Sequence, residues 1–160
     1  MYKIISIFLL FVQVVSCSDP NPRIANEFWG RVVSVADGDT FTLLTEGRQQ
    51  LKIRLHGIDC PEKKQDFGQV AKQKLSDLIS SQTVHVVKKN VDRYGRTVAL
   101  VYDEENNCIN ETMLKAGLAW HYIKYDQNPE WQEMEDLARA NRLGLWSQPT
   151  AIPPWEWRHK

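Results

Sequence analysis

The sequence predicts an α+β domain built on a five-stranded β-barrel of the OB type that carries three α-helices. Three observations support this fold class. There are five short segments with strand-like hydropathy, a helix-like segment between the third and the fourth of them, and two further helices after the fifth. This order fits the OB barrel, although the pattern alone also allows an unrelated α+β domain.

The strands are recognised by alternating side chains and by the turns between them. Asp37-Gly38 and Glu46-Gly47 are hairpin-turn signals that separate the first three strands. In the third strand Lys52 and Arg54 lie on the face opposite an apolar stripe, because side chains alternate along a strand. The expected strands span residues 28–35, 40–44, 50–55, 83–87 and 97–101.

The helices are indicated by apolar spacing and by end signals. Residues 67–79 carry apolar side chains at helical spacing, and residues 110–116 form a short helix. The third helix has Asn128 as its N-cap and Pro129 at its first position. We expect the domain to span residues 28–148, and residues 149–160 to form a tail that packs on it.

The first 16 residues predict a targeting segment. Lys3 is their only charge, and it precedes an apolar run from Ile4 to Val15. This run is shorter than the ~20 apolar residues that span a bilayer, and it indicates a signal peptide over residues 1–16. A buried N-terminal strand or helix is the alternative. Residues 17–27 are expected to form a linker.

The end of the apolar run resembles the lipobox of bacterial lipoproteins. An apolar residue stands three positions before Cys17, and the small Ser16 directly precedes it. The resemblance implies that Cys17 is lipidated and that the protein is exported, as a periplasmic or outer-membrane lipoprotein or in secreted form. Ordinary signal cleavage nearby is the alternative. Contact with a membrane is expected only through this lipid.

Composition excludes several classes of protein. A hydrophobic fraction of 42% excludes a disordered chain, and a formal net charge of zero excludes a strongly basic nucleic-acid coat. Residues 48–96 nevertheless hold eleven Lys and Arg against five acids, whereas residues 103–156 hold four against ten. The basic middle suggests a localised anionic partner. Cys60 and Cys108 either pair in an oxidising compartment or stay as independent thiols.

Three short stretches carry the candidate functional residues. Asp39 closes a hairpin turn, and Asp59 and Glu62 follow a strand, so their carboxylates can converge at one end of a barrel. Carboxylate oxygens, with carbonyls and water, suit a hard cation such as Ca²⁺, which would polarise a phosphoryl oxygen. The stretches are Asp37-Gly38-Asp39-Thr40, Ile53 to Glu62, and Asp92-Arg93-Tyr94-Gly95-Arg96.

The arginines complete a possible phosphate site. The guanidinium groups of Arg54 and Arg96 match phosphate oxygens two at a time and would stabilise charge on a pentacoordinate phosphorus. Glu62 could orient or deprotonate an attacking water. Each residue taken singly has an ordinary structural explanation, such as turn capping by Asp39. Their combined order and spacing favour the functional interpretation.

These residues resemble the thermonuclease family, typified by staphylococcal (micrococcal) nuclease. The resemblance covers about residues 28–146, and the ending over residues 152–158 also looks like the tail of bacterial thermonuclease-like proteins. It is carried by DGDT (37–40), by the pattern Arg54, Asp59, Pro61 and Glu62, by DRYGR (92–96), by Asn110-Glu111, by Gly117-Leu118-Ala119 and by Leu145-Trp146.

The resemblance implies a Ca²⁺-dependent nuclease that cleaves DNA and RNA at the P–O5′ bond, leaves 3′-phosphates and has little sequence specificity. Asp39 and Asp59 would bind Ca²⁺ through carboxylates, and Cys60 through its main-chain carbonyl. The catalytic residues would be Arg54, Glu62 as general base, and Arg96. Tyr94 would contact a phosphate or pack near the nucleotide. We expect a monomer that favours single-stranded substrate.

This chain departs from the family pattern in three places. Cys60 stands where relatives often have Thr, and the segment from Lys63 to Asp66 is short, so a loop that flanks the substrate is missing. The aromatic residue that stacks on the base aligns with Ile123. Neighbouring aromatic side chains are possible substitutes, although Trp120 is expected in the core. These neighbours are Trp120, His121, Tyr122 and Tyr125.

Two other functional classes remain open at this stage. One is a noncatalytic OB module that binds nucleic acid or a protein. The other is a lipoprotein with a structural role at the cell envelope. The intact set of Arg54, Glu62 and Arg96 favours the enzyme over both, because a scaffold has no need to keep these residues together.

Overall fold

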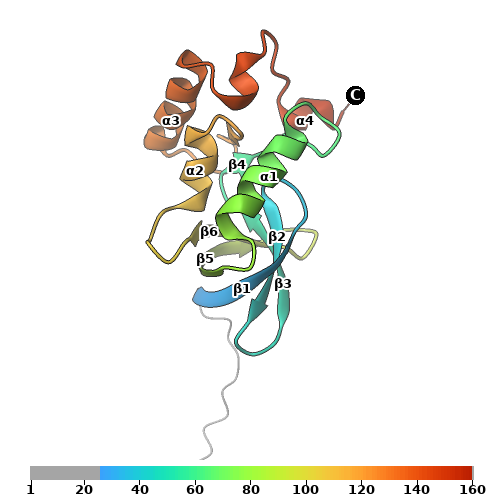
Figure 1. Ribbon diagram of the computed structural model, residues 1–160, viewed down its shortest axis with the longest axis vertical. Coiled ribbons are helices and arrows are strands. Elements are labelled where there is room, and N and C mark those ends of the chain that lie inside the picture. The colour runs from blue at the N-terminus through green and yellow to red at the C-terminus, as the bar shows by residue number, and fades with distance from the viewer. Residues whose placement is uncertain (1–25, 160) are drawn as a thin grey trace, which may run out of the picture.

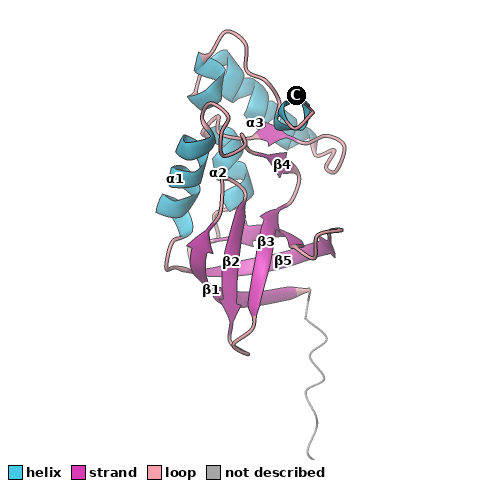
Figure 2. Cartoon of the chain, turned by 90° about the vertical axis from the view of Figure 1, so that its right-hand side faces the viewer, coloured by secondary structure: helices cyan, strands magenta, loops and turns pink. Residues whose placement is uncertain are grey.

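The computed structural model describes residues 26–159, so the predicted signal peptide, Cys17 and most of the predicted linker lie outside the described residues. Five strands close into a barrel in the order β1-β2-β3-β6-β5, with helices at one end of it (Figures 1 and 2). The predicted fold class is therefore confirmed. The strands are β1 (Glu27–Val35), β2 (Thr40–Thr45), β3 (Gln50–Leu55), β5 (Thr83–Val91) and β6 (Thr97–Tyr102).

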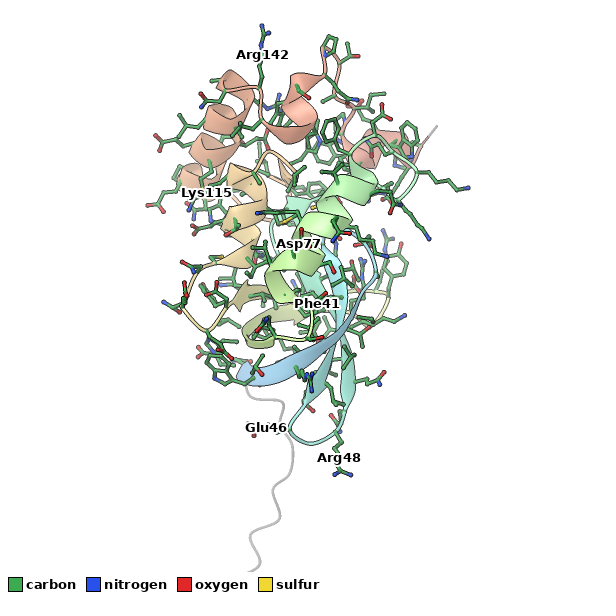
Figure 3. All side chains as sticks on the ribbon, viewed as in Figure 1. Phe41, Glu46, Arg48, Asp77, Lys115 and Arg142 are labelled. Atoms are coloured by element: carbon green, nitrogen blue, oxygen red, sulfur yellow. The ribbon has the colours of Figure 1, made fainter. Side chains whose placement is uncertain are left out.

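Alternation along the strands fills the barrel interior. Phe41, labelled near the centre of Figure 3, is fully buried, as are Leu43 in the same strand and Ile53 in the next one. All strand pairs are antiparallel except β3 with β6, which is parallel. A parallel pair needs a long crossover connection, and here α1 (Gly68–Ile79) and β5 supply it.

Helix α1 closes one side of the barrel and fixes the loop before it. Ala71, Leu75 and Ile79 lie on its buried face. At its N-terminus a Cβ atom on Gly68 would stand 2.0 Å from the carbonyl oxygen of Glu62. The helix can therefore approach the backbone of Glu62 only because residue 68 has no side chain.

The remaining helices pack above the barrel. They are α2 (Ile109–Lys115), α3 (Pro129–Ala140), the 3₁₀ turn η1 (Gly144–Ser147) and α4 (Pro154–Trp157). The predicted start of α3 is confirmed, since Asn128 Oδ1 accepts a hydrogen bond from the Glu130 N–H at 3.0 Å. Within α2 the buried Asn110 side chain accepts from Val101 N–H and donates to the carbonyl of His56. This side chain therefore ties α2 to the barrel.

Four short elements were not predicted. Strands β4 (Ile58–Asp59) and β7 (Trp120–His121) form a two-stranded antiparallel sheet, in which Asp59 pairs with Trp120. The other two are η1 and α4. Elements of two to four residues are too short to show the periodicity from which helices and strands are recognised.

A second apolar cluster holds the end of the chain. Trp120, Trp146 and Trp155 meet edge to face, with centroids 4.3 Å apart for Trp120 and Trp146 and 5.7 Å apart for Trp120 and Trp155. The guanidinium of Arg139 lies 3.8 Å from the centroid of the Trp146 ring. Trp120 is buried, as expected from the sequence. No helix among residues 26–159 has the length and apolar character needed to cross a membrane.

Candidate active site

The register of the barrel brings the predicted acids and Arg54 together. In the β2–β3 pair Thr40 lies opposite Arg54, so Asp39, directly before Thr40, stands beside the Arg54 side chain. Asp59 ends β4, a few residues after Arg54 in the chain. Two of the stretches that the sequence analysis singled out thus meet at the end of the barrel that carries the helices.

Arg54 bridges the two aspartates. Its Nη2 lies 2.7 Å from Asp59 Oδ1, and its Nη1 forms an ion pair with Asp39 Oδ2. Asp39 is 6% exposed and Asp59 only 1%. Buried carboxylates require a partner, because an unpaired charge loses its hydration without compensation. Arg54 therefore allows two acids to be buried side by side.

Further hydrogen bonds fix the Asp39 carboxylate. Its Oδ1 accepts from the Thr40 hydroxyl at 3.0 Å, and its Oδ2 accepts from the Cys60 N–H at 2.9 Å. The Cys60 thiol donates to the Gly38 carbonyl at 3.2 Å. Burial raises the pKa of Cys60 far above its ordinary value, against the lowering effect of Arg54. The thiol stays neutral, which leaves the carbonyl as the hard donor that Cys60 offers a cation.

Cys60 and Cys108 are separate free thiols in the described chain. Cys60 is buried beneath the β1–β2 turn, whereas Cys108 is half-buried and precedes α2. Of the two alternatives that the sequence left open, the structure therefore contains the independent thiols. The Cys60 loop is held by hydrogen bonds to Gly38 and Asp39 instead.

Arg96 reaches the same region through a hydrogen-bonded turn. Asp92 Oδ2 accepts from Arg96 Nε at 2.7 Å, and Arg96 Nη1 lies 3.5 Å from the Thr40 hydroxyl that also contacts Asp39. Burial acts to raise the pKa of Asp92, but hydrogen bonds from Arg96 and Tyr94 outweigh it and lower the pKa. The Tyr94 ring is 71% exposed, and the guanidinium of Arg96 lies 5.4 Å from its centroid.

Glu62 is the most exposed acid of the site. Its main-chain N–H donates to Gln65 Oε1 at 3.1 Å, which shapes the short loop before α1. Gln65 in turn donates to the carbonyl of Ile152, in the segment that leads to α4. Figure 1 shows α4 next to this loop. The position of Glu62 is therefore coupled to the C-terminal segment.

Arg158 is a residue of the site that the sequence analysis missed. Its Nη2 lies 2.6 Å from Asp59 Oδ2, and its Nη1 lies 2.6 Å from Glu62 Oε1. Burial acts to lower the pKa of Arg158, but the two acids outweigh it and raise the pKa, so this guanidinium stays charged. The tail was expected only to pack on the domain, and no pattern in it indicated an ion pair with residues almost a hundred positions earlier.

The candidate stacking residues have different surroundings. Trp120 and His121 are buried, whereas Ile123 and Tyr125 are more than half exposed. The Tyr122 ring stacks on Trp155 of α4, with centroids 4.9 Å apart and planes at 10°. This pair lines an open hollow of ≈ 660 Å³ between the segment after β7 and α4.

A polar cluster that sequence reasoning did not assign includes His121, which also lines this hollow. Nε2 of His56 and Nε2 of His121 lie 3.1 and 3.3 Å from the two carboxylate oxygens of Asp126. Burial acts to raise the pKa of Asp126, but hydrogen bonds from Asn128 N–H, His121 and His56 outweigh it and lower the pKa. Asp126 is therefore ionised in the folded protein over a wider pH range than in the unfolded chain.

This shift predicts a pH-dependent effect of Asp126→Asn. A carboxylate whose folded pKa is lowered stabilises the fold above the ordinary value of about 3.9, and this stabilisation is lost as pH falls through the folded pKa. We expect the variant to melt at a lower temperature than wild type at pH 7, with the difference shrinking below about pH 4. Thermal unfolding from pH 3 to pH 7 measures this, and a constant difference would contradict it.

The donor chemistry of the site fits a hard cation. Asp39 and Asp59 both direct carboxylate oxygens at the Arg54 guanidinium, so the two carboxylates lie close together. Carboxylates, carbonyls and water are the usual ligands of Ca²⁺. Asp59 contacts a second guanidinium as well. Among residues 26–159 no group of three or more His, Cys, Asp or Glu side chains is arranged to hold a metal. A cation would thus depend on two carboxylates, with carbonyl and water oxygens.

Comparison with known proteins identifies relatives of the chain. A family model described as "Staphylococcal nuclease homologue" matches residues 52–148. An "Uncharacterized endonuclease" of Haemophilus influenzae is 42% identical over 155 residues, which cover 97% of this chain and 83% of the relative. The "Micrococcal nuclease" of Shigella flexneri is 44% identical over 142 residues, which cover 82% of this chain and 81% of the relative.

An "Uncharacterized endonuclease" of Escherichia coli is 40% identical over 139 residues, which cover 87% of this chain and 90% of the relative. The barrel, the acids and arginines gathered at its end, and these relatives together define a nuclease, an enzyme whose substrate is nucleic acid. The chain belongs to the staphylococcal nuclease family.

Proposed function

We propose that the protein is a Ca²⁺-dependent nuclease that hydrolyses phosphodiester bonds in DNA and RNA at P–O5′, leaves 3′-phosphates and has little sequence specificity. The observation that supports this most is the convergence of two buried aspartates, Arg54 and Glu62 at one end of the barrel. Arg96 joins them through the Thr40 hydroxyl. These groups are the acids and cations that in-line attack on a phosphodiester needs.

Asp39, Asp59 and the carbonyl of Cys60 are the residues we assign to the cation. Bound there, Ca²⁺ would withdraw electron density from a phosphoryl oxygen of the substrate. The protein contributes the rigid placement of the two carboxylates. Asp39 is held by Thr40 and by the Cys60 N–H, and Asp59 by Arg54.

Glu62 and the two arginines would act on the reacting phosphate. Glu62 has the exposure needed to hold an attacking water and to take its proton. A guanidinium has five N–H donors, so Arg54 retains donors for phosphate after its bonds to Asp39 and Asp59. Arg96 is half-buried and keeps one edge toward the Thr40 hydroxyl. Both would stabilise charge that develops on the phosphorus oxygens.

The surroundings of the site favour single-stranded substrate. The stretch 48–96 carries the excess of Lys and Arg, which attracts the phosphate backbone. Tyr94 and the Tyr122–Trp155 stack offer aromatic faces, on which unpaired bases stack without sequence preference. The hollow beside Tyr122 and Trp155 is open to solvent and could admit a base.

A cleavage assay tests the proposed activity. The purified chain without residues 1–17 is incubated with a single-stranded oligonucleotide in Ca²⁺ or in EGTA, and the ends of the products are identified. We expect cleavage in Ca²⁺, loss of cleavage in EGTA, and products with 3′-phosphates. Binding of the oligonucleotide without cleavage in Ca²⁺ would contradict the proposal and would favour a noncatalytic binding module.

Gly68→Ala is expected to disturb the site from a distance. The new Cβ would stand 2.0 Å from the Glu62 carbonyl oxygen, so the loop that carries Glu62 must move. Overpacking of this kind costs about 1–3 kcal/mol of stability, and the displaced Glu62 should lower the rate of cleavage. Gly47→Ala is the matched control, since its Cβ would meet nothing closer than 3.8 Å. Equal melting temperatures and cleavage rates for both variants would contradict the argument.

We also propose that the protein is exported as a monomer. The support for export is sequence alone: residues 1–16 have the character of a signal peptide, and Cys17 follows a lipobox-like stretch. Mass spectrometry of the mature protein tests this, because a lipid on Cys17 would support the lipoprotein form. An unmodified N-terminus beyond Cys17 would contradict lipidation while leaving export by ordinary cleavage.

A further inference from the structure

We propose that Arg158 is a built-in competitor of the divalent cation: its guanidinium pairs with the Asp59 and Glu62 carboxylates and must leave Asp59 for the cation to bind. The C-terminal segment would thereby set the apparent affinity of the site for Ca²⁺. This inference rests on the proposed function, because it assumes that Asp59 binds the cation.

Arg158 makes contacts with the same Asp59 carboxylate oxygens that a bound metal ion would use. One guanidinium nitrogen lies 2.6 Å from Asp59 Oδ2, and the other lies 2.6 Å from Glu62 Oε1 and 3.4 Å from Asp59 Oδ1. With Arg54 on Oδ1 as well, both oxygens of Asp59 accept hydrogen bonds from guanidinium groups. Asp59 is 1% exposed, so a cation could not approach it from solvent while Arg158 stays in place.

Electrostatics disfavour contact of Arg158 with Asp59 while a divalent cation is bound there. Arg158 carries a full positive charge at every pH at which the protein is folded. A divalent ion on Asp59 would stand within a few ångströms of this charge, where repulsion between like charges is strong in a partly buried site. Binding of the cation and contact of Arg158 with Asp59 therefore oppose each other, and linkage requires the effect to be reciprocal.

The segment that carries Arg158 is anchored independently of this contact. Trp155 stacks on Tyr122 and meets Trp120 edge to face, and Gln65 donates to the carbonyl of Ile152. Pro154 is buried. The guanidinium can therefore swing away on its long side chain while α4 stays docked. A group tethered in this way has a high effective concentration at the carboxylates.

The size of the expected change in Ca²⁺ affinity depends on the fraction of molecules in which Arg158 contacts Asp59. The apparent dissociation constant equals the intrinsic one divided by the fraction of protein that is competent to bind. If Arg158 covers Asp59 in about nine molecules of ten, its removal tightens Ca²⁺ binding about tenfold.

Calorimetric titration with Ca²⁺ in the absence of nucleic acid tests the proposal without relying on catalysis. We expect Arg158→Gln to bind Ca²⁺ about tenfold more tightly than wild type. Arg158→Lys keeps the charge but loses the planar guanidinium. Its affinity for Ca²⁺ should lie between those of wild type and Arg158→Gln. Lys63→Gln is the control for a general effect of charge, because it removes an exposed positive charge next to Glu62 in the chain, whereas the ion-pair partners of Asp59 among the described residues are Arg54 and Arg158. We expect it to change the affinity less than about twofold, since exposed charges are screened.

Thermal unfolding supplies a second readout. In EDTA, Arg158→Gln should melt below wild type, because Asp59 and Glu62 lose a partner. In saturating Ca²⁺ this difference should shrink, because the cation then neutralises Asp59 in both proteins. A gap in melting temperature that is the same in EDTA and Ca²⁺ would overturn the proposal.

The outcomes separate this inference from the proposed function. Unchanged or weaker Ca²⁺ binding in Arg158→Gln, with Ca²⁺-dependent cleavage by wild type, overturns the role of Arg158 alone. Failure of every variant to bind Ca²⁺ overturns both this role and the calcium dependence of the proposed function. Tighter binding in Arg158→Gln, with little change in Lys63→Gln, supports the proposal even if cleavage has not been detected.

Discussion

Glu62→Gln is expected to lower the turnover number for single-stranded DNA by about 10²–10⁴-fold, the range typical for loss of a general base. The amide has nearly the same size as the carboxylate and can still accept a hydrogen bond from Arg158, but it cannot take a proton from water. KM should change much less than kcat, because Glu62 is not assigned to substrate binding. Steady-state cleavage of a labelled oligonucleotide in saturating Ca²⁺ measures both constants.

Glu46→Gln is the matched control for this change. Glu46 is an exposed acid in the turn between β2 and β3, at the end of the barrel away from the helices (Figure 3). The Glu46→Gln variant loses the same charge as Glu62→Gln but leaves the site untouched. Its turnover should stay within about twofold of wild type, because surface substitutions away from such sites have small effects. Normal turnover in Glu62→Gln would exclude Glu62 as the base, and another group would then have to activate water.

Arg54→Ala is expected to damage both stability and catalysis. The change removes the group between Asp39 and Asp59 and leaves two buried carboxylates without their shared partner. Breaking a buried ion pair in this way costs about 3–5 kcal/mol, which denaturant unfolding in EDTA would measure. For the molecules that remain folded, loss of a donor that stabilises transition-state charge should also lower turnover by about 10²–10³-fold.

Two further variants separate these effects. Arg54→Lys keeps a positive charge between the aspartates but loses the planar fork, so it should recover most of the stability and little of the turnover. Lys52→Ala removes a charge from the same face of β3 at an exposed position and should leave stability nearly unchanged. If Arg54→Ala unfolded at the same denaturant concentration as wild type, the bridging role of Arg54 would be wrong.

The sequence predicted those parts of the fold that repeat a local pattern. Alternation identified the five barrel strands, and the Asn128-Pro129 pair located the start of α3, because strand pleating and helix capping depend on neighbouring residues. The meeting of Asp39 with Arg54 was suggested by motif order. Its geometric cause is the β2–β3 register, in which Thr40 faces Arg54.

Features formed between distant segments were not predicted. Arg158 contacts Asp59 across 99 positions, and it is placed by a four-residue helix that has no detectable period. The sharing of Asp126 by His56 and His121 depends likewise on how β3 and the segment after β7 pack. The choice between a disulfide and free thiols at Cys60 and Cys108 needed the distance between two loops, which composition does not contain.

The central claim is that a hard cation, two guanidinium groups and the Glu62 carboxylate act on one phosphodiester at the helix-bearing end of the barrel. A crystal structure with Ca²⁺ and an uncleaved oligonucleotide analogue tests it most directly. The account predicts calcium at about 2.3–2.6 Å from oxygens of Asp39 and Asp59. Arg54 and Arg96 should donate hydrogen bonds to the phosphate beside it, and Arg158 should no longer contact Asp59. Calcium bound elsewhere, or a phosphate that touches neither arginine, would contradict the account.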